Sequence, residues 1–195
     1  IDQFVLRGGR LLVFMDPVAE MDKSEGGLLG SGFEDKSSTL DQLLVAWGVH
    51  FDPKGVVLDY GYAHSIPVTR YGQALPHVGV MGIHDAGLNR EDPMTAGVDL
   101  VNFATPGALA SMPEATTAFT PLVYSSADSQ VMNVDEYNKH GNHADLLNHY
   151  KADGKGPYTL AALVTGPVKT AFPEGLKTEY EHKHLASSGD MSVVL

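Results

Sequence analysis

The chain has 195 residues, of which 43% are hydrophobic and 19% are charged, and its formal net charge at pH 7 is −11. These fractions exclude an intrinsically disordered chain and suit one globular domain spanning residues 1–195. The negative charge argues against nucleic acid or an anionic membrane surface as the main partner, and the absence of cysteine excludes disulfides, cysteine-bound metals and thiol nucleophiles.

The chain begins with a helix end that runs into a strand. Apolar residues at helical spacing in 1–5 are followed by Gly8-Gly9, where a helix C-cap belongs. The nearly continuous apolar run 10–15 then predicts a strand that is buried on both faces, as in a parallel sheet. This is the second half of a βαβ unit, and residues 191–195 have the pattern of another buried strand. We therefore expect the chain to be a fragment, truncated at both ends.

The next region contains a polar loop and the clearest helix of the sequence. Residues 18–37 are rich in Gly, Ser, Glu and Lys and predict a mobile loop over the edge of the sheet. Ser38 is a candidate N-cap, and an apolar stripe with helical spacing follows it up to Trp47. Gly48 then predicts the end of this helix.

The remaining sequence alternates extended runs with turns and one more helix. Residues 60–97, broken by His, Gly and Pro, predict an irregular insertion that carries an antiparallel excursion. A helix is expected within 134–150, best over 143–150, and the turn formers Thr165-Gly166-Pro167 are expected to interrupt the last strong strand. The predicted strands are 56–58, 66–68, 78–81, 100–104, 119–125 and 158–164.

Together these elements predict an α/β fold with a mostly parallel central sheet and flanking helices. Two of the strands end in aspartate, Asp16 and Asp59, so both carboxylates are expected at the carboxyl edge of the sheet, where open α/β folds bind ligands. They are the candidate residues for binding a ligand or a cation. Turn chemistry is the simpler interpretation, because aspartate initiates turns well, as Asp16 does before Pro17.

Nine histidines raise the possibility of a metal site. His140 and His143 form an H-x₂-H pair, which is the candidate metal-binding pair. Zinc requires three or four ligands in a tetrahedral arrangement, and this pair matches no zinc signature such as H-E-x-x-H. Because the pair lies in a polar segment, ordinary surface histidines are the competing interpretation.

Catalytic signatures are missing from the sequence. The nucleophile elbow G-x-S-x-G does not occur, and a Cys-His amidase is excluded because the chain has no cysteine. The glycine-rich stretch 26–32 matches neither the P-loop nor the G-x-G-x-x-G pattern between a strand and a helix. We therefore expect no catalytic residues and no cofactor.

Three segments carry a family resemblance. Residues 1–17, IDQFVLRGGRLLVFMDP, resemble a stretch in the auxiliary, extracytoplasmic component of a class of bacterial ABC transport systems. This family includes the gliding-motility-associated ABC transporter auxiliary protein. The resemblance continues through the helix, WGV and VVLD of residues 43–59, and through YTLAALVTGPVKTAFPEG at 158–175. The chain departs from the family where its usual Glu-Gly pair is replaced by Thr165-Gly166.

The resemblance implies fold and location more than mechanism. It implies a non-enzymatic domain in the periplasm or another extracytoplasmic space, with a flavodoxin-like or class I amidotransferase-like α/β fold. Membrane helices outside residues 1–195 would anchor the domain to the cytoplasmic membrane, and the permease and ATPase subunits of the same system would be its partners. The family transfers no catalytic residues, and its amidotransferase-like architecture is an analogy of fold.

Two other functions remain open from the sequence. A small-molecule or sugar-binding receptor domain would use the strand edge near Asp16 and Asp59, under the loop 18–37. A metal-dependent enzyme would use the histidines. The leading hypothesis is an auxiliary domain that binds a partner or a cargo on the outer face of the cytoplasmic membrane.

Overall fold

The structure is a computed structural model that describes residues 1–19, 37, 40–67, 72–140, 142–175 and 184–195. Within these residues it contains eleven strands, four α-helices and one 3₁₀ helix, and none of these helices is long and apolar enough to cross a membrane. Most of the predicted mobile loop 18–37, with the glycine-rich stretch 26–32 and the Ser38 cap, lies outside the described residues.

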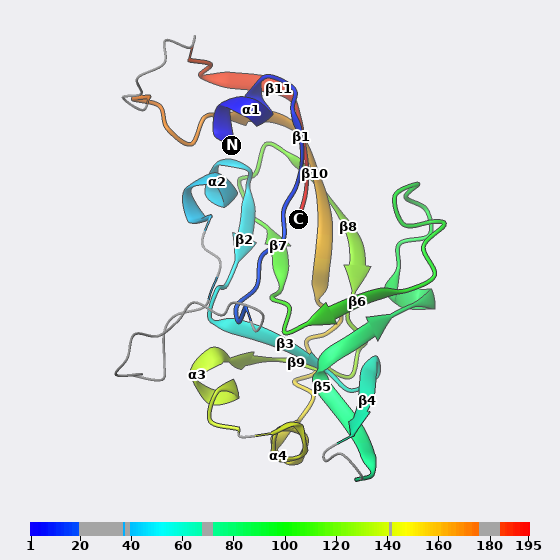
Figure 1. Ribbon diagram of the computed structural model, residues 1–195. Helices are drawn as coiled ribbons and strands as arrows, with labels where there is room; N and C mark the ends of the chain where they lie inside the picture. The colour runs from blue at the N-terminus through cyan, green and yellow to red at the C-terminus, as the bar shows by residue number, and fades with distance from the viewer. Residues whose placement is uncertain (20–36, 38–39, 68–71, 141, 176–183) are drawn as a thin grey trace.

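Strands dominate the fold, and the longest helix has seven residues among those described. Figure 1 shows the elements, which in chain order are α1 (Asp2–Leu6), β1 (Arg10–Leu12), α2 (Asp41–Ala46), β2 (Val49–Phe51), β3 (Gly55–Asp59), β4 (Ala63–Pro67), β5 (Ala74–Ile83), η1 (Asp85–Gly87), β6 (Val101–Ala104), β7 (Leu109–Ser111), β8 (Ala118–Tyr124), β9 (Ser129–Asn133), α3 (Val134–Tyr137), α4 (His143–His149), β10 (Thr159–Lys169) and β11 (Ser187–Val194).

The predicted α/β fold with a mostly parallel sheet, flavodoxin-like or amidotransferase-like, is wrong. The main sheet has the order β1-β11-β10-β7-β2, with β8 also paired to β10, and β1–β11 is the one parallel pair among the described strands. A two-stranded sheet, β3–β9, and a three-stranded sheet, β4-β5-β6, are antiparallel. Parallel neighbours need crossovers of a dozen or more residues, usually helical, and the described helices have four to seven residues.

The apolar run 10–15 misled the prediction because it is buried on one face only. Leu11, Val13 and Met15 are partly buried and pack against the first core cluster, whereas Leu12 and Phe14 are 60% and 82% exposed. The run therefore has the period of two that is typical of a half-buried strand, with apolar residues on its outer face as well. A continuous apolar run cannot distinguish this arrangement from burial on both faces.

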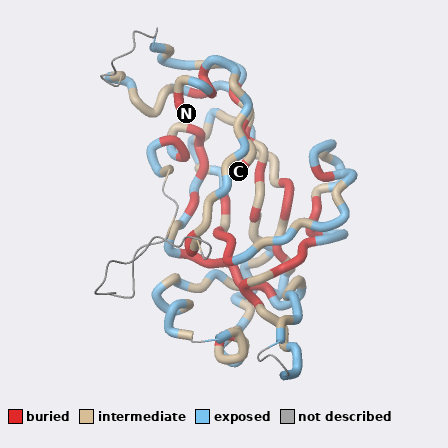
Figure 2. The backbone as a smooth tube through the Cα atoms, in the orientation of Figure 1, coloured by how far each residue is buried: buried red, intermediate tan, exposed pale blue. Residues whose placement is uncertain are grey.

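Three apolar clusters are stacked through the molecule, with β10 and β3 between them. Ala162, Val164 and Val168 of β10 belong to the first cluster, and Leu160 belongs to the second. In β3, Val57 faces the second cluster, whereas Val56 and Leu58 belong to the third. All five residues of β3 are buried, and Figure 2 shows this buried band crossing the middle of the molecule.

Helix α1 is fastened to the segment between β10 and β11. The buried Asp2 carboxylate accepts hydrogen bonds from the Thr170 hydroxyl at 2.7 Å and from the Ala171 N–H at 2.9 Å. The Gln3 side chain donates to the Leu185 carbonyl at 2.9 Å and accepts from the Leu185 N–H at 2.8 Å. These bonds hold α1 against β11, and the chain enters β1 parallel to β11 as a consequence.

Several local predictions are confirmed despite the wrong fold class. The strands predicted at 56–58, 100–104 and 119–125 are β3, β6 and β8, and the helix at 143–150 is α4, capped by the Asn142 side chain. A shorter helix, α2, occupies part of 38–47. The antiparallel excursion is also present, since the region 60–97 contains β4 and the ten-residue β5.

The predicted interruption at Thr165-Gly166-Pro167 is wrong. β10 continues to Lys169, and its register with β11 shifts between Gly166 and Val168. Gly166 has a φ of 109°, a conformation that costs glycine little. The turn formers therefore produce a bulge, not a strand end.

Asp2→Asn tests the fastening of α1. Burial opposes the charge of Asp2, but the hydrogen bonds from Thr170, Ala171 and Gln3 outweigh it, so the pKa of this carboxyl lies below its ordinary value of 3.8. We expect the substitution to lower the free energy of unfolding by about 1–3 kcal/mol at neutral pH. Because a lowered pKa stabilises the fold above the unfolded-state value, the difference should shrink as the pH falls below 3.8.

Urea unfolding of both proteins between pH 2 and pH 7 measures this difference. Asp190→Asn is the matched control, because Asp190 is an exposed carboxylate on β11. An Asp2→Asn protein that is as stable as the parent at pH 7 would contradict the role of the fastening.

Candidate functional site

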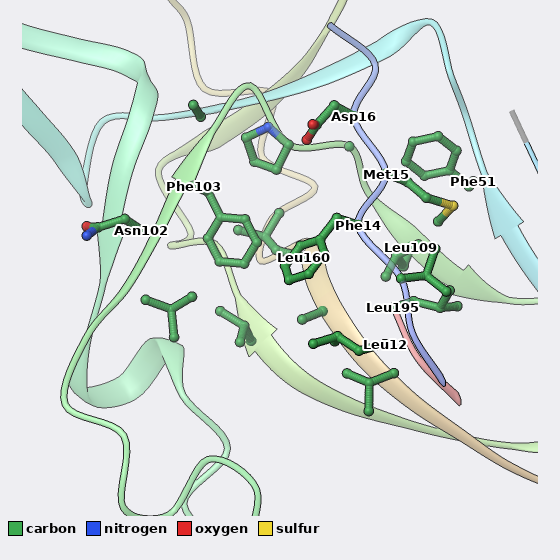
Figure 3. A pocket seen from close by; sticks show the side chains of 18 residues that line it. Leu12, Phe14, Met15, Asp16, Phe51, Asn102, Phe103, Leu109, Leu160 and Leu195 are labelled. Atoms are coloured by element: carbon green, nitrogen blue, oxygen red, sulfur yellow. The ribbon is translucent and has the colours of Figure 1, made fainter. Parts of the chain in front are cut away.

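A pocket with a volume of about 340 Å³ lies between the first and second core clusters. Phe51 and Leu109 of the first cluster and Val123 and Leu160 of the second all contribute to its wall. The extended segment 12–16 and the residues of β6 also line the pocket, and Figure 3 shows Phe14, Phe103 and Leu160 around the space. The pocket is thus a gap where two cores meet around β10.

The pocket adjoins the solvent-exposed face of the segment 12–16. Its backbone follows β11, since the Val13 N–H donates to the Val194 carbonyl at 2.8 Å. The alternation of the extended chain places Leu12 and Phe14 on the exposed side, while both also contribute to the lining. We call Leu12 and Phe14 the apolar strip. An aromatic ring left in water beside an apolar pocket is typical of a binding surface.

The chemistry of the lining is almost entirely apolar. Among the described lining residues, only Asp16 and Asn102 have polar side chains. Asn102 is already engaged, because its side-chain oxygen lies 2.9 Å from Nε2 of His64. Such a lining can hold an apolar side chain or ligand, but among the described residues it does not offer a nucleophile with an adjacent base.

A strained turn forms one wall of the pocket. Thr105 has a φ of 48°, which is rare for a β-branched residue, and its side chain is buried. Its hydroxyl donates to the Val18 carbonyl at 2.9 Å, and its N–H donates to the Gly79 carbonyl at 2.7 Å. The next carbonyl, that of Pro106, accepts from the Val57 N–H at 2.8 Å. The wall is therefore tied to three separate segments.

Gly107 is needed in this turn for space. A Cβ atom at this position would lie 2.4 Å from Cε2 of Phe51 and 3.0 Å from Cγ of Pro17. Phe51 is buried in the first cluster, so its ring has little freedom to move away. The close approach of Phe51 to the turn thus defines this side of the pocket.

Asp16 and Asp59, which the sequence predicted at the same edge of one sheet, have different surroundings in the structure. Asp16 lines the pocket, whereas Asp59 lies outside the lining and is fully buried at the end of β3. Asp59 accepts hydrogen bonds from the Ser126 N–H at 2.5 Å, the Ser126 hydroxyl at 2.6 Å and the Tyr62 N–H at 3.2 Å. These bonds give Asp59 a structural task at a turn, and a ligand contact stays a prediction for both residues.

The two histidines of the predicted pair make different contacts, and metal binding by that pair stays a prediction. Nε2 of His143 lies 3.0 Å from the Ile66 carbonyl oxygen, and its ring stacks on His77. His140 is grouped instead with Asp145 and His149. The sequence contains one signal for this group, because Asp145 and His149 are four residues apart and therefore share one face of the predicted helix.

Sequence reasoning missed the lining of the pocket. Leu12 and Phe14 were expected to lie in a strand buried on both faces, and 100–104 was predicted only as a strand. Only the burial pattern of the folded chain distinguishes the apolar strip from the core. No local signal of sequence identifies the turn 105–107 as a wall of the same pocket.

Comparison with known families identifies the chain. The model of one family, described as an ABC-type uncharacterized transport system, matches residues 1–195. The chain belongs to this family of auxiliary ABC transport components. No curated protein and no solved structure matches it. The suspected resemblance is thereby confirmed for the family, while the link to gliding motility stays a prediction.

Membership of this family makes the chain an auxiliary component of an ABC-type transport system. Membership of a transport system implies that its partners are transporter subunits. The candidate site must therefore be judged as a surface for such a component.

Gly107→Ala tests the close approach that shapes the pocket. The added methyl group would collide with the Phe51 ring, so we expect a loss of about 1–3 kcal/mol in the free energy of unfolding. Gly97→Ala is the control, because no atom lies within 4 Å of the Cβ position there.

Chemical denaturation measures both variants. Adding Phe51→Leu to Gly107→Ala should recover part of the loss, since leucine lacks the ring atom in the collision. Equal effects of the two alanine substitutions would contradict the proposed tight wall.

Proposed function

We propose that this chain is a non-enzymatic, partner-binding domain that lies on the outer face of the cytoplasmic membrane. Its partner is the permease subunit of its own ABC transport system, which binds at the apolar strip and the adjoining pocket. The observation that carries this proposal is the exposure of Phe14 and Leu12 beside an apolar pocket of about 340 Å³. Exposed apolar residues of this kind cost solubility unless a partner covers them.

Location supports the choice of the permease over the ATPase. An ATPase subunit works on the cytoplasmic side, so a domain on the outer face can reach only the membrane-spanning subunit and its outer loops. The chain has 24 acidic and 13 basic residues, which favours a partner surface with basic groups. An apolar side chain flanked by lysine or arginine, on a permease loop, would match the apolar pocket and the acidic excess of the chain.

The same charge argues against insertion of the apolar strip into lipid. A net charge of −11 is repelled by anionic headgroups, and two residues bury little area in a bilayer. A sugar is a weaker match for this pocket, because sugars require several hydrogen-bonding groups and, among the described lining residues, only Asp16 and Asn102 have polar side chains, of which Asn102 already contacts His64.

Phe14→Ser combined with Leu12→Ser tests the docking surface. Truncation of a central aromatic anchor typically costs 2 kcal/mol or more, so we expect binding to the permease to weaken by about 30-fold or more. Co-purification of the permease with the affinity-tagged parent protein from detergent-solubilised membranes of the native host measures the effect.

Val45→Ser is the matched control, because Val45 is 61% exposed on α2, away from the pocket lining. Undiminished co-purification with the double variant, at normal thermal stability, would refute docking at the apolar strip. Recovery of the ATPase without the permease would refute the choice of partner.

A single introduced cysteine tests the location. Residues 1–195 contain no cysteine, so Lys151→Cys at an exposed position gives one reporter thiol in this domain. We expect a membrane-impermeant maleimide to label it in intact spheroplasts, provided that any cysteine elsewhere in the protein is replaced. Labelling only after lysis would place the domain in the cytoplasm and contradict the proposal.

A further inference from the structure

Two histidines and one aspartate converge around α4, far along the chain from the apolar strip. Asp145 and His149 are four residues apart on α4 and therefore lie on the same face of the helix. His140 comes from the segment before the helix, and the potential ligand atoms of the three residues all lie within 4.8 Å of one another. The fold thus assembles a ligand set that the H-x₂-H pair did not predict.

The distances within this cluster approach those of a metal site. Nδ1 of His140 lies 2.8 Å from Oδ2 of Asp145, and Nδ1 of His149 lies 3.5 Å from Oδ1 of Asp145. The two imidazole rings have centroids 4.7 Å apart. Tetrahedral zinc, with bonds of about 2.0–2.1 Å to nitrogen and oxygen, separates its ligand atoms by about 3.3 Å. The third pair, His140 and His149, has ligand atoms within 4.8 Å of each other, so side-chain shifts of up to about 1.5 Å would admit the ion.

A second observation concerns the burial of His140. Its side chain is only 7% exposed, and its Nε2 atom is buried without a hydrogen-bond partner among the described residues. Buried polar atoms are nearly always paired, so an unpaired ring nitrogen requires an explanation. Nδ1 of His140 is the nitrogen that faces Asp145, so Nε2 is the ring nitrogen that the packing leaves unsatisfied.

The surroundings favour a cation. Lys139 is held by Glu136 at 2.8 Å, so the nearest lysine in sequence already has a counter-ion. His149 is exposed and Asp145 is partly exposed, so an ion can enter from solvent.

We propose that His140, Asp145 and His149 bind one Zn²⁺ ion. Two imidazoles and one carboxylate are a donor set that zinc accepts readily, and three protein ligands leave a fourth position for water or for a side chain of a partner. The ion would link the segment before α4 to the last turn of that helix. A seven-residue helix is marginal alone, and such a link would hold its contact through Leu146 with the third core cluster.

Zinc titration of the protein, purified without a polyhistidine tag and stripped with a chelator, tests this site. Competition with a chromogenic zinc chelator should give one ion per chain. Even outer residues of metal sites typically contribute 10–100-fold to affinity, so the loss of a direct ligand in His149→Gln or Asp145→Asn should weaken binding by about 100-fold or more. Both positions are more open than His140, so these variants are the ones expected to keep the fold.

Two histidine variants serve as controls. His50→Gln changes an exposed histidine on β2, and His143→Gln changes the other member of the sequence pair. Both should bind zinc as the parent does, with circular dichroism confirming that every variant is folded. In addition, zinc should raise the melting temperature of the parent and not that of His149→Gln.

Absence of stoichiometric zinc in the parent would overturn the proposal. So would unchanged affinity in His149→Gln, or an equal loss in His50→Gln. Loss of binding in His143→Gln but not in His149→Gln would assign the metal to the sequence pair instead. None of these results bears on permease docking, because the cluster shares no residue with the pocket lining.

Discussion

Pairing of β10 along both of its edges is the constraint on which the rest of the structure depends. β8 pairs along one edge, whereas β7 at the start and β11 along the remainder occupy the other edge. A strand paired along both edges satisfies its backbone hydrogen bonds within the sheet, and the two faces of β10 lie against different apolar clusters. The first and second clusters supply those two faces, and β3 then closes the second cluster on its far side.

The pocket is a consequence of this layering. The first and second clusters meet around β10 but do not close completely, and the turn 105–107, which approaches Phe51 closely and is fixed by its own hydrogen bonds, forms one side of the remaining space. Thr105 adopts a strained backbone conformation there, and strain of this kind persists only where surrounding contacts over-determine it. A rigid turn on one side and an exposed strand segment on the other give a preformed apolar surface. Such a surface suits a component that acts by docking.

Local patterns gave correct elements wherever the signal lay within one element. The helix predicted at 143–150 is present, and so is the strand predicted from the apolar residues 56–58. Errors arose where pairing partners decide the outcome. Gly166 forms a bulge because β11 runs beside it, and the run 10–15 is half exposed because nothing described packs on Leu12 and Phe14. Each of these outcomes depends on residues far away in the chain.

The sequence by itself determined the family, the order of most strands and helices, and the absence of cysteine chemistry, because these are properties of contiguous residues. Only the tertiary structure decided the antiparallel sheets, the apolar strip and the grouping of His140 with Asp145 and His149. The physical reason is that strand direction follows from long-range pairing, and a site follows from which side chains that pairing brings together. The hydrophobic periodicity of a segment indicates which of its faces is more apolar, but not which other segment packs against that face.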